Sequence, residues 1–217
     1  MPALLDLILP PACAGCGRAG ALLCRACLAA FRRASEPEDR FVAPDPAAVV
    51  GDALALAVAA FRYDGPLRRA LAALKYGGAA RVAPTLAQAA MPALGPLIAV
   101  SGPSVLVPVP VHPERRRVRG YNQAALIARE LAAVTGLRME ELLERVRPTT
   151  KQHALGRAAR LANLRGAFAA NRAMVGSPVV ILVDDIITTT ATLEACASVL
   201  RDAGVEAAFG FAVAREI

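Results

Sequence analysis

Residues 179–193 read VVILVDDIITTTATL, a run of five apolar residues followed by two acids and then by a series of threonines. The apolar run is rich in β-branched residues, which predicts a buried strand. Apolar residues recur at helical spacing from Leu193 onward, so the threonines are expected in the turn between a strand and a helix. Open α/β sheets bind their ligands at such junctions, beyond the carboxyl ends of the strands.

The residues of this turn suit a phosphorylated sugar. The unpaired amides of a helix's first turn attract phosphate, and hydroxyl groups add donors at Thr188, Thr189, Thr190 and Thr192. Asp184 and Asp185 can accept hydrogen bonds from sugar hydroxyls or help to hold Mg²⁺. A Walker B strand is an alternative, but the sequence has no G-x-x-x-x-G-K-[ST] motif. Threonines that only cap the helix are another alternative.

The rest of the chain alternates strand-like and helix-like segments, which indicates an α/β protein. Its composition is 56% hydrophobic but only 4% aromatic, so the core is expected to be aliphatic. Strands are expected at 53–61, 104–111, 178–185 and 207–214. Helices are expected from Pro66 to Gly77, over 82–91, between Gly120 and Gly136, and from Leu193 to Gly204. Asn122 and Gln123 suit either a helix cap or a ligand contact.

Basic residues are concentrated in a few places, and the net charge is +7. Residues 145–183 carry seven basic residues and no acid. Such a cluster attracts a phosphorylated ligand or a nucleic acid, although a solvated surface is the simpler alternative. A loop is expected to carry Arg115, Arg116, Arg117 and Arg119, and a second loop to carry Lys151, Arg157 and Arg160. Lys75 is a further candidate cation.

The N-terminal region contains two Cys-x-x-Cys pairs. Cys13 and Cys16 form the first pair, and Cys24 and Cys27 form the second. Four thiolates at this spacing predict a tetrahedral structural Zn²⁺ site, and two disulfides are the alternative. Cys196 falls on the apolar face of its expected helix and is assigned to the core.

Residues 179–193 resemble the phosphoribosyl pyrophosphate (PRPP) motif of type I phosphoribosyltransferases, in which D-D-x-x-T-T-G-x-T follows an apolar run. The chain also resembles the ComF family of competence-associated, phosphoribosyltransferase-like proteins. This second resemblance rests on LLDLILPPACAGCG, FRYDGPLRRALAALKYGG, VPVPVHPERRRVRGYNQAALIAREL and RVRPTTKQHALGRAARLANLRGAF. It implies a parallel sheet flanked by helices, a small hood and an N-terminal zinc-binding module.

The resemblance also implies roles for individual residues. Transfer from Mg²⁺–PRPP would depend on Asp184, Asp185, Lys151 and Arg157 as catalytic residues. PRPP would be bound by the two acids, the turn from Thr188 through Ala191 to Thr192, Arg115, Arg119 and Lys75. Thr190 departs from the motif, which has glycine at this position. If the turn requires a left-handed backbone there, a β-branched residue costs on the order of 1–2 kcal/mol.

Three regions are expected: a zinc-finger module at 1–35, a linker with the hood and first strand–helix unit at 36–100, and a phosphoribosyltransferase-like core at 101–217. We expect a cytoplasmic protein without a membrane span. One functional hypothesis is a phosphoribosyltransferase, for which the sequence does not identify the acceptor. The other is a non-catalytic PRPP sensor that binds single-stranded DNA or other competence proteins. The resemblance associates both hypotheses with DNA uptake.

Overall fold

The centre of the molecule is a five-stranded sheet in which all neighbouring strands are parallel. A computed structural model describes residues 10–34, 52–147, 164, 166–171 and 178–216. The sheet order is β1 (Leu54–Arg62), β7 (Ala207–Arg215), β6 (Val179–Ile187), β2 (Ser104–Pro108) and β3 (Arg138–Met139). The strand predicted from the apolar run, β6, is therefore the central strand, and Val180 to Val183 are fully buried in it.

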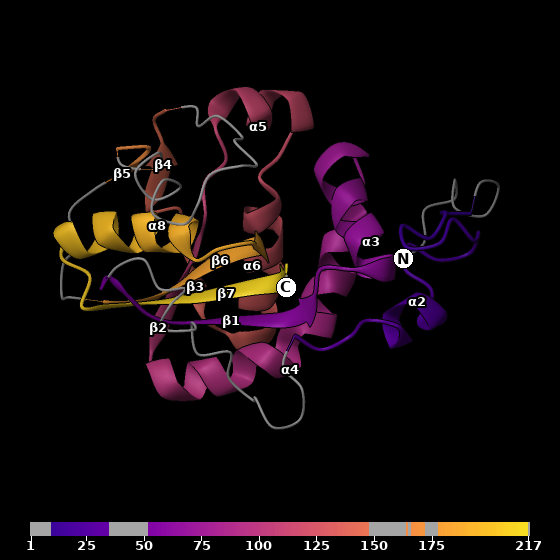
Figure 1. The fold of residues 1–217 in the computed structure, drawn as a ribbon, viewed down its shortest axis with the longest axis horizontal. Coiled ribbons are helices and arrows are strands. Elements are labelled where there is room, and N and C mark those ends of the chain that lie inside the picture. The colour runs from indigo at the N-terminus through magenta and orange to yellow at the C-terminus, as the bar shows by residue number, and fades with distance from the viewer. Residues whose placement is uncertain (1–9, 35–51, 148–163, 165, 172–177, 217) are drawn as a thin grey trace.

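Helices cover both faces of the sheet, as Figure 1 shows. One face packs against α3 (Gly65–Tyr76), α4 (Ala83–Ser101) and α6 (Gln123–Thr135). The opposite face packs against α8 (Ala191–Asp202), which begins directly after the threonine turn. Alternate residues of β6 divide between the two cores: Ile181 belongs to the first and Leu182 to the second. The expected α/β fold, with a parallel sheet flanked by helices, is confirmed.

Smaller elements surround this framework. They are α2 (Arg25–Ala29), the 3₁₀ turn Ala80–Val82, α5 (Pro113–Arg119) and the antiparallel pair β4 (Leu143–Arg145) and β5 (Phe168–Ala170). The prediction that Arg115 to Arg119 lie in a loop is wrong, because these residues form helix α5. Pro113 occupies its first turn, and Gly120 ends it at a positive φ of 81°.

Helix α4 is longer than the sequence predicted. It continues through Pro92 and Pro96 to Ser101, well beyond the expected end at residue 91. It also belongs to the single helical stretch of the described residues, 80–101, that is long and apolar enough to cross a membrane, with a mean hydropathy of 1.3. The stretch meets this criterion by length and composition only, so the expectation of no membrane span stays a prediction. Leu86, Leu94 and Leu97 are fully buried against the sheet and its helices, so core packing accounts for much of this apolar character.

The region 36–100 contributes directly to the sheet. Its strand β1 pairs with β7 along most of its length, from Leu54 with Ala208 to Arg62 with Arg215. Residues 36–51, which hold most of the expected linker, lie outside the described residues. The three-part division of the chain remains a prediction, although β1 and residues after 101 share one sheet.

Candidate functional site

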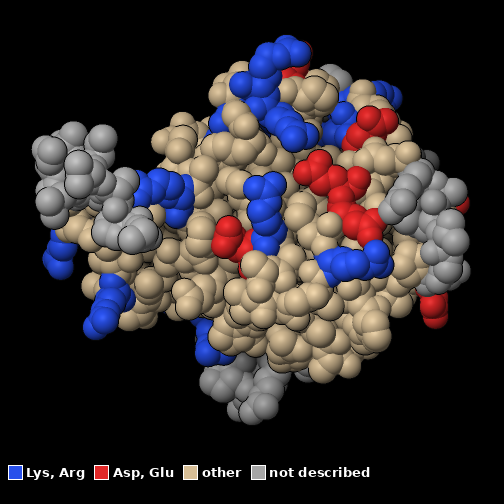
Figure 2. Space-filling view, turned by 180° about the vertical axis from the view of Figure 1, so that it is seen from behind, with Lys and Arg blue, Asp and Glu red and all other residues tan. Residues whose placement is uncertain are grey.

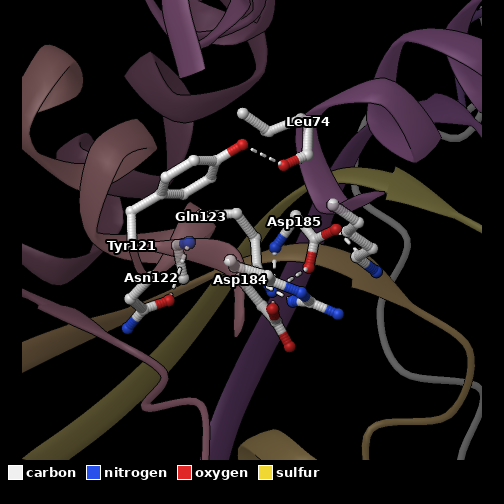
Figure 3. Close-up of polar contacts among 9 residues, drawn as sticks. Leu74, Tyr121, Asn122, Gln123, Asp184 and Asp185 are labelled. Atoms are coloured by element: carbon white, nitrogen blue, oxygen red, sulfur yellow. Dashed lines mark hydrogen bonds and ion pairs between the residues drawn. The ribbon is translucent and has the colours of Figure 1, made fainter. Parts of the chain in front are cut away.

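The acid pair lies near the carboxyl end of the central strand β6, just before its last residues, Ile186 and Ile187. Asp185 is only 2% exposed, whereas Asp184 is partly buried. The Asp185 amide donates a hydrogen bond to Asp184 Oδ1 at 2.8 Å. As Figure 3 shows, the side chains of α3 and α6 approach this strand end from neighbouring elements. The structure thus places both acids at the carboxyl edge of the sheet, as the sequence predicted.

Both carboxylate oxygens of Asp185 contact other side chains. Lys75, in the last turn of α3, places Nζ 2.7 Å from Asp185 Oδ2. Gln123 Nε2 donates to Asp185 Oδ1 at 3.3 Å, and Arg119 donates to Gln123 Oε1 at 2.8 Å. Asp185 is therefore held by protein contacts, and Asp184 is the more accessible acid of the pair.

The charges of this cluster affect one another. Burial raises the pKa of Asp184 well above its usual value, and the neighbouring charge of Asp185 raises it further, while Lys75 opposes the shift. Burial alone would lower the pKa of Lys75, but the charge and hydrogen bond of Asp185, together with the charges of Asp184 and Tyr63, outweigh burial, and the net pKa is raised. The site therefore holds a stable ammonium beside two carboxyl groups, of which Asp184 binds its proton unusually tightly.

The threonine turn connects β6 to α8. Thr188 is exposed, Thr189 is half-buried and Thr190 is buried. Thr190 has φ −70° and ψ −3°, an ordinary right-handed conformation. The departure from glycine therefore carries no left-handed backbone cost in this structure. The Thr190 side chain makes no capping hydrogen bond to α8, which argues against a purely capping role for it.

Glu194, in the first turn of α8, was not identified from the sequence. It is only 4% exposed, and its carboxylate accepts hydrogen bonds from the amides of Ala53 at 2.8 Å and Leu54 at 3.1 Å. These bonds fix the start of edge strand β1 to the helix that follows the threonine turn. A buried carboxylate bound by backbone amides of a distant strand has no local sequence signal.

The candidate cations of α3 and α5 lie together. Lys75, Arg115 and Arg119 all line one pocket of about 480 Å³. In Figure 2, basic side chains gather at the top of the molecule, in the region of α5, with acidic side chains beside them. Lys151, Arg157 and Arg160 lie outside the described residues, so their proposed role remains a prediction.

A second pocket, of about 310 Å³, opens beside the end of β2. Arg116 and Arg145 line it together with Glu141 and Glu144. Arg145 lies with its guanidinium carbon 5.3 Å from the centre of the Phe168 ring. Burial lowers the pKa of Arg145, and the positive charge of Arg115 lowers it further. Arg145 was counted in the basic segment but was not chosen as a site residue.

The start of α6 is fixed by its neighbours. Asn122 is the helix cap, since its side-chain oxygen accepts from the Ala124 amide at 3.0 Å. Its amide nitrogen donates to the Val109 carbonyl at 3.0 Å. Tyr121 donates its hydroxyl to the Leu74 carbonyl at 2.7 Å, which ties this segment to α3 (Figure 3). Of the two possible cap residues, Asn122 caps the helix and Gln123 contacts Asp185.

The four N-terminal cysteines form one cluster, with sulfur atoms within 4.8 Å of one another. Tetrahedral zinc with Zn–S bonds of about 2.3 Å requires sulfur separations of about 3.8 Å. The Cys16 and Cys24 sulfurs are 3.7 Å apart, far longer than a disulfide bond of about 2.05 Å. The donor set thus fits the expected structural zinc site.

The cysteine cluster also favours thiolate ligands. Burial raises the pKa of Cys13, but hydrogen bonds from the amides of Cys24, Gly15 and Cys16 outweigh burial and lower it to about 6. Burial and the surrounding thiols raise the pKa of Cys27 to about 12. One thiolate is therefore available at neutral pH before a metal binds, and a bound cation would favour ionisation of the rest.

The cysteine cluster packs against the start of α3. Arg69 Nε donates to the Gly15 carbonyl, and Arg32 pairs with Asp64, the residue that precedes α3. A Cβ atom at Gly15 would lie 2.8 Å from the Cys27 sulfur and 3.2 Å from Pro66 Cβ. Glycine is therefore required at this close contact between the cluster and the helix.

The fold and its two sites define the chain as a parallel α/β protein. It carries an acid pair and a threonine turn at the carboxyl edge of its sheet, and a four-cysteine module at its N-terminal end. No protein-family model matches the chain. The chain is 36% identical over 107 residues to competence protein F of Haemophilus influenzae. The matched stretch covers 48% of this chain and 47% of that protein. It is 36% identical over 99 residues to DNA utilization protein YhgH of Salmonella typhimurium, covering 45% and 43% respectively.

The Escherichia coli protein of that name is 34% identical over 106 residues, covering 48% of this chain and 46% of the relative. The chain thus spans about half the length of the curated relatives it matches. These similarities agree with the resemblance to the ComF family seen in the sequence.

Proposed function

We propose that the chain binds Mg²⁺–PRPP at the carboxyl edge of its sheet and transfers the phosphoribosyl group to a nitrogenous acceptor. The proposal is carried by one juxtaposition: only Ile186 and Ile187 separate the acid pair of β6 from the threonine turn that opens α8. In this proposal the 5′-phosphate binds the turn from Thr188 to Thr192, and the ribose hydroxyls bind the acid pair.

The two acids have different roles in this proposal. Asp184 is the accessible carboxylate and contacts the ribose hydroxyls or the Mg²⁺ that accompanies the pyrophosphate. Asp185 is held by Lys75 and Gln123, so it positions Lys75 and Asp184. Lys75 and Arg119 supply positive charge for the departing pyrophosphate, as Lys151 and Arg157 would from outside the described residues.

The proposed reaction is a nucleophilic substitution at C1 of the ribose. A nitrogen of the acceptor forms a bond to C1 while the bond from C1 to the pyrophosphate oxygen breaks. Pyrophosphate leaves with the electron pair of that bond, and the proton of the attacking nitrogen passes to solvent. Positive charge develops on the ribose. A bound Mg²⁺ would favour the ionised form of Asp184 despite its raised pKa, and that carboxylate would stabilise the positive charge electrostatically.

The names of the relatives favour a role in competence or DNA utilisation, and we extend that association to this chain. A second candidate function is a non-catalytic PRPP sensor that contacts single-stranded DNA. It is favoured by the exposed Arg116 and Arg117 of α5 and by the net charge of +7. Binding to an oligonucleotide that weakens steeply with salt and is lost on charge reversal at Arg115, Arg116 and Arg117 would support it.

Calorimetric titration with Mg²⁺–PRPP tests the primary proposal. The wild type is expected to bind, and Asp184→Asn is expected to weaken binding about tenfold or more through loss of a charged hydrogen-bond acceptor. Asp202→Asn, at the exposed last residue of α8, is a matched control for the loss of a carboxylate and should bind normally. Absence of binding by the folded wild type would refute the proposed site. Binding without PRPP-dependent release of pyrophosphate for any nitrogenous acceptor would favour the sensor.

A further inference from the structure

The pocket between α3 and α5 combines exposed apolar side chains with charged ones. Tyr76, at the end of α3, is 68% exposed, and Val118, in α5, is 89% exposed. Tyr121 adds a second aromatic ring, which is fixed because its hydroxyl donates to the Leu74 carbonyl at 2.7 Å. The pocket therefore presents exposed aromatic and aliphatic side chains among the described residues.

The same pocket is positively charged. Lys75, Arg115 and Arg119 line it, and Glu114 is the single acid among its described lining residues, so the lining carries a net charge of +2 (three minus one). The guanidinium carbon of Arg119 lies 5.2 Å from the centre of the Tyr76 ring. An arginine stacked on an aromatic ring forms a flat platform on which a further planar group can stack.

This pocket adjoins the acid pair. Lys75 belongs to the pocket lining, and its Nζ lies 2.7 Å from Asp185 Oδ2. Arg119 reaches the same carboxylate through Gln123, to which it donates at 2.8 Å. A ligand in the pocket would thus lie beside the proposed ribose position.

We infer that the pocket between α3 and α5 binds a planar aromatic ring that carries an acidic group. The ring packs against Tyr76, Val118 and the Arg119 guanidinium, and the acidic group binds Arg115 or Arg119. The volume of about 480 Å³ lies within the usual range of small-molecule sites, roughly 300–1,000 Å³. The identification of this ligand as the acceptor of the phosphoribosyl group rests on the proposed function; the binding site itself does not.

The test uses 2-aminobenzoate, a fluorescent aromatic acid with a nucleophilic nitrogen, titrated with and without Mg²⁺–PRPP. The protein contains no tryptophan, so its own fluorescence is weak. Aniline lacks the acid and cyclohexanecarboxylate lacks the aromatic ring, so each removes one of the two recognised features. In competition with 2-aminobenzoate, both are expected to bind at least about tenfold more weakly.

Variants assign the binding to the pocket. Tyr76→Leu is expected to weaken 2-aminobenzoate binding about fivefold. Tyr76→Phe keeps the aromatic ring and is expected to bind 2-aminobenzoate as the wild type does. Because Tyr76 is mostly exposed, neither change should affect folding. Val134→Ser is a matched control, since Val134 is 65% exposed on α6 and does not line the pocket.

The outcomes separate this inference from the proposed function. Binding of Mg²⁺–PRPP without binding of 2-aminobenzoate under either condition overturns the inference and leaves the proposed function standing. Equal weakening by Tyr76→Leu and Val134→Ser, or equal binding of aniline and 2-aminobenzoate, also overturns it. Binding of 2-aminobenzoate that depends on Tyr76, with no binding of Mg²⁺–PRPP, supports the aromatic-acid pocket and refutes the proposed function.

Discussion

Lys75 Nζ and Asp185 Oδ2 lie 2.7 Å apart, although one residue belongs to the last turn of helix α3 and the other lies near the end of the central strand β6. The side chains are only 19% and 3% exposed, so both charges are largely removed from water. A second carboxyl group, that of Asp184, is close enough to influence the pKa of Lys75. This ion pair fixes the end of α3 over the edge of the sheet where the threonine turn begins.

Removal of Lys75 should therefore destabilise the protein. We expect Lys75→Met to lower the free energy of unfolding by about 3 kcal/mol, because Asp185 would lose its buried counter-charge. The folded pKa of Lys75 is raised, so its contribution should persist below its ordinary pKa and disappear as the pH rises through the raised value. Urea unfolding over an alkaline pH series measures this. The double variant Lys75→Met/Asp185→Asn is expected to recover much of the loss; additive losses would contradict the pairing.

Asp184 should show the opposite effect on stability. Its pKa is raised by burial and by Asp185, so the ionised carboxylate costs free energy in the folded state at neutral pH. We expect Asp184→Asn to stabilise the protein by about 1 kcal/mol at pH 7. The gain should shrink as the pH falls. Asp184 becomes protonated in acid, and the free-energy cost of its ionised carboxylate, which the substitution removes, then disappears. Thermal unfolding of both proteins between acid and neutral pH tests this, and a gain that grows toward acid pH would refute it.

The cysteine cluster should bind one zinc ion per chain. Cys16→Ser is expected to abolish zinc retention, because three thiolates cannot complete the four-sulfur site. Cys196→Ala is the matched control, since Cys196 is fully buried in the core and outside the cluster. Metal analysis of the purified proteins by mass spectrometry provides the measurement. Full zinc content in Cys16→Ser would exclude the four-cysteine site.

Thr190 should be at least as suitable as the glycine of the PRPP motif in the observed conformation. Its φ of −70° gives glycine no steric advantage, while glycine loses more backbone freedom on folding. We expect Thr190→Gly to lower stability by about 1 kcal/mol without tightening Mg²⁺–PRPP binding. Thermal unfolding and calorimetry measure the two effects, with Thr190→Ser as the hydroxyl-retaining control. Tighter binding by the glycine variant would show that the bound turn adopts a left-handed backbone.

The elements with strong periodicity could be predicted from the sequence. The apolar run before Asp184 became central strand β6, and the helices around Leu71 and Ile127 became α3 and α6. The cysteine cluster was also predicted, because its spacing encodes a local chelating geometry. These features depend on residues near one another in the chain, which a sequence displays directly.

The features that were missed depend on tertiary structure. Helix α5 is short and highly charged, and its sequence lacks a buried face that periodicity could reveal. Strands β3, β4 and β5 have two or three residues each, too few to show alternation. The contacts of Glu194 with β1 and of Lys75 with Asp185 arise only when the sheet assembles. The sequence identified the candidate cations, but the pocket shared by α3 and α5 required the fold.

Helix α3 has contacts with a different site at each end. Near its start, Arg69 and Pro66 lie against Gly15 of the cysteine cluster, and near its end Lys75 binds Asp185. Twelve helical residues span about 18 Å, and a helix of that length moves nearly as a rigid rod. A shift of the cysteine cluster would thus displace the ammonium at the acid pair. Any free-energy coupling through α3 must be reciprocal, so a ligand at the sheet edge would change zinc affinity by the same factor that zinc changes the affinity for the ligand.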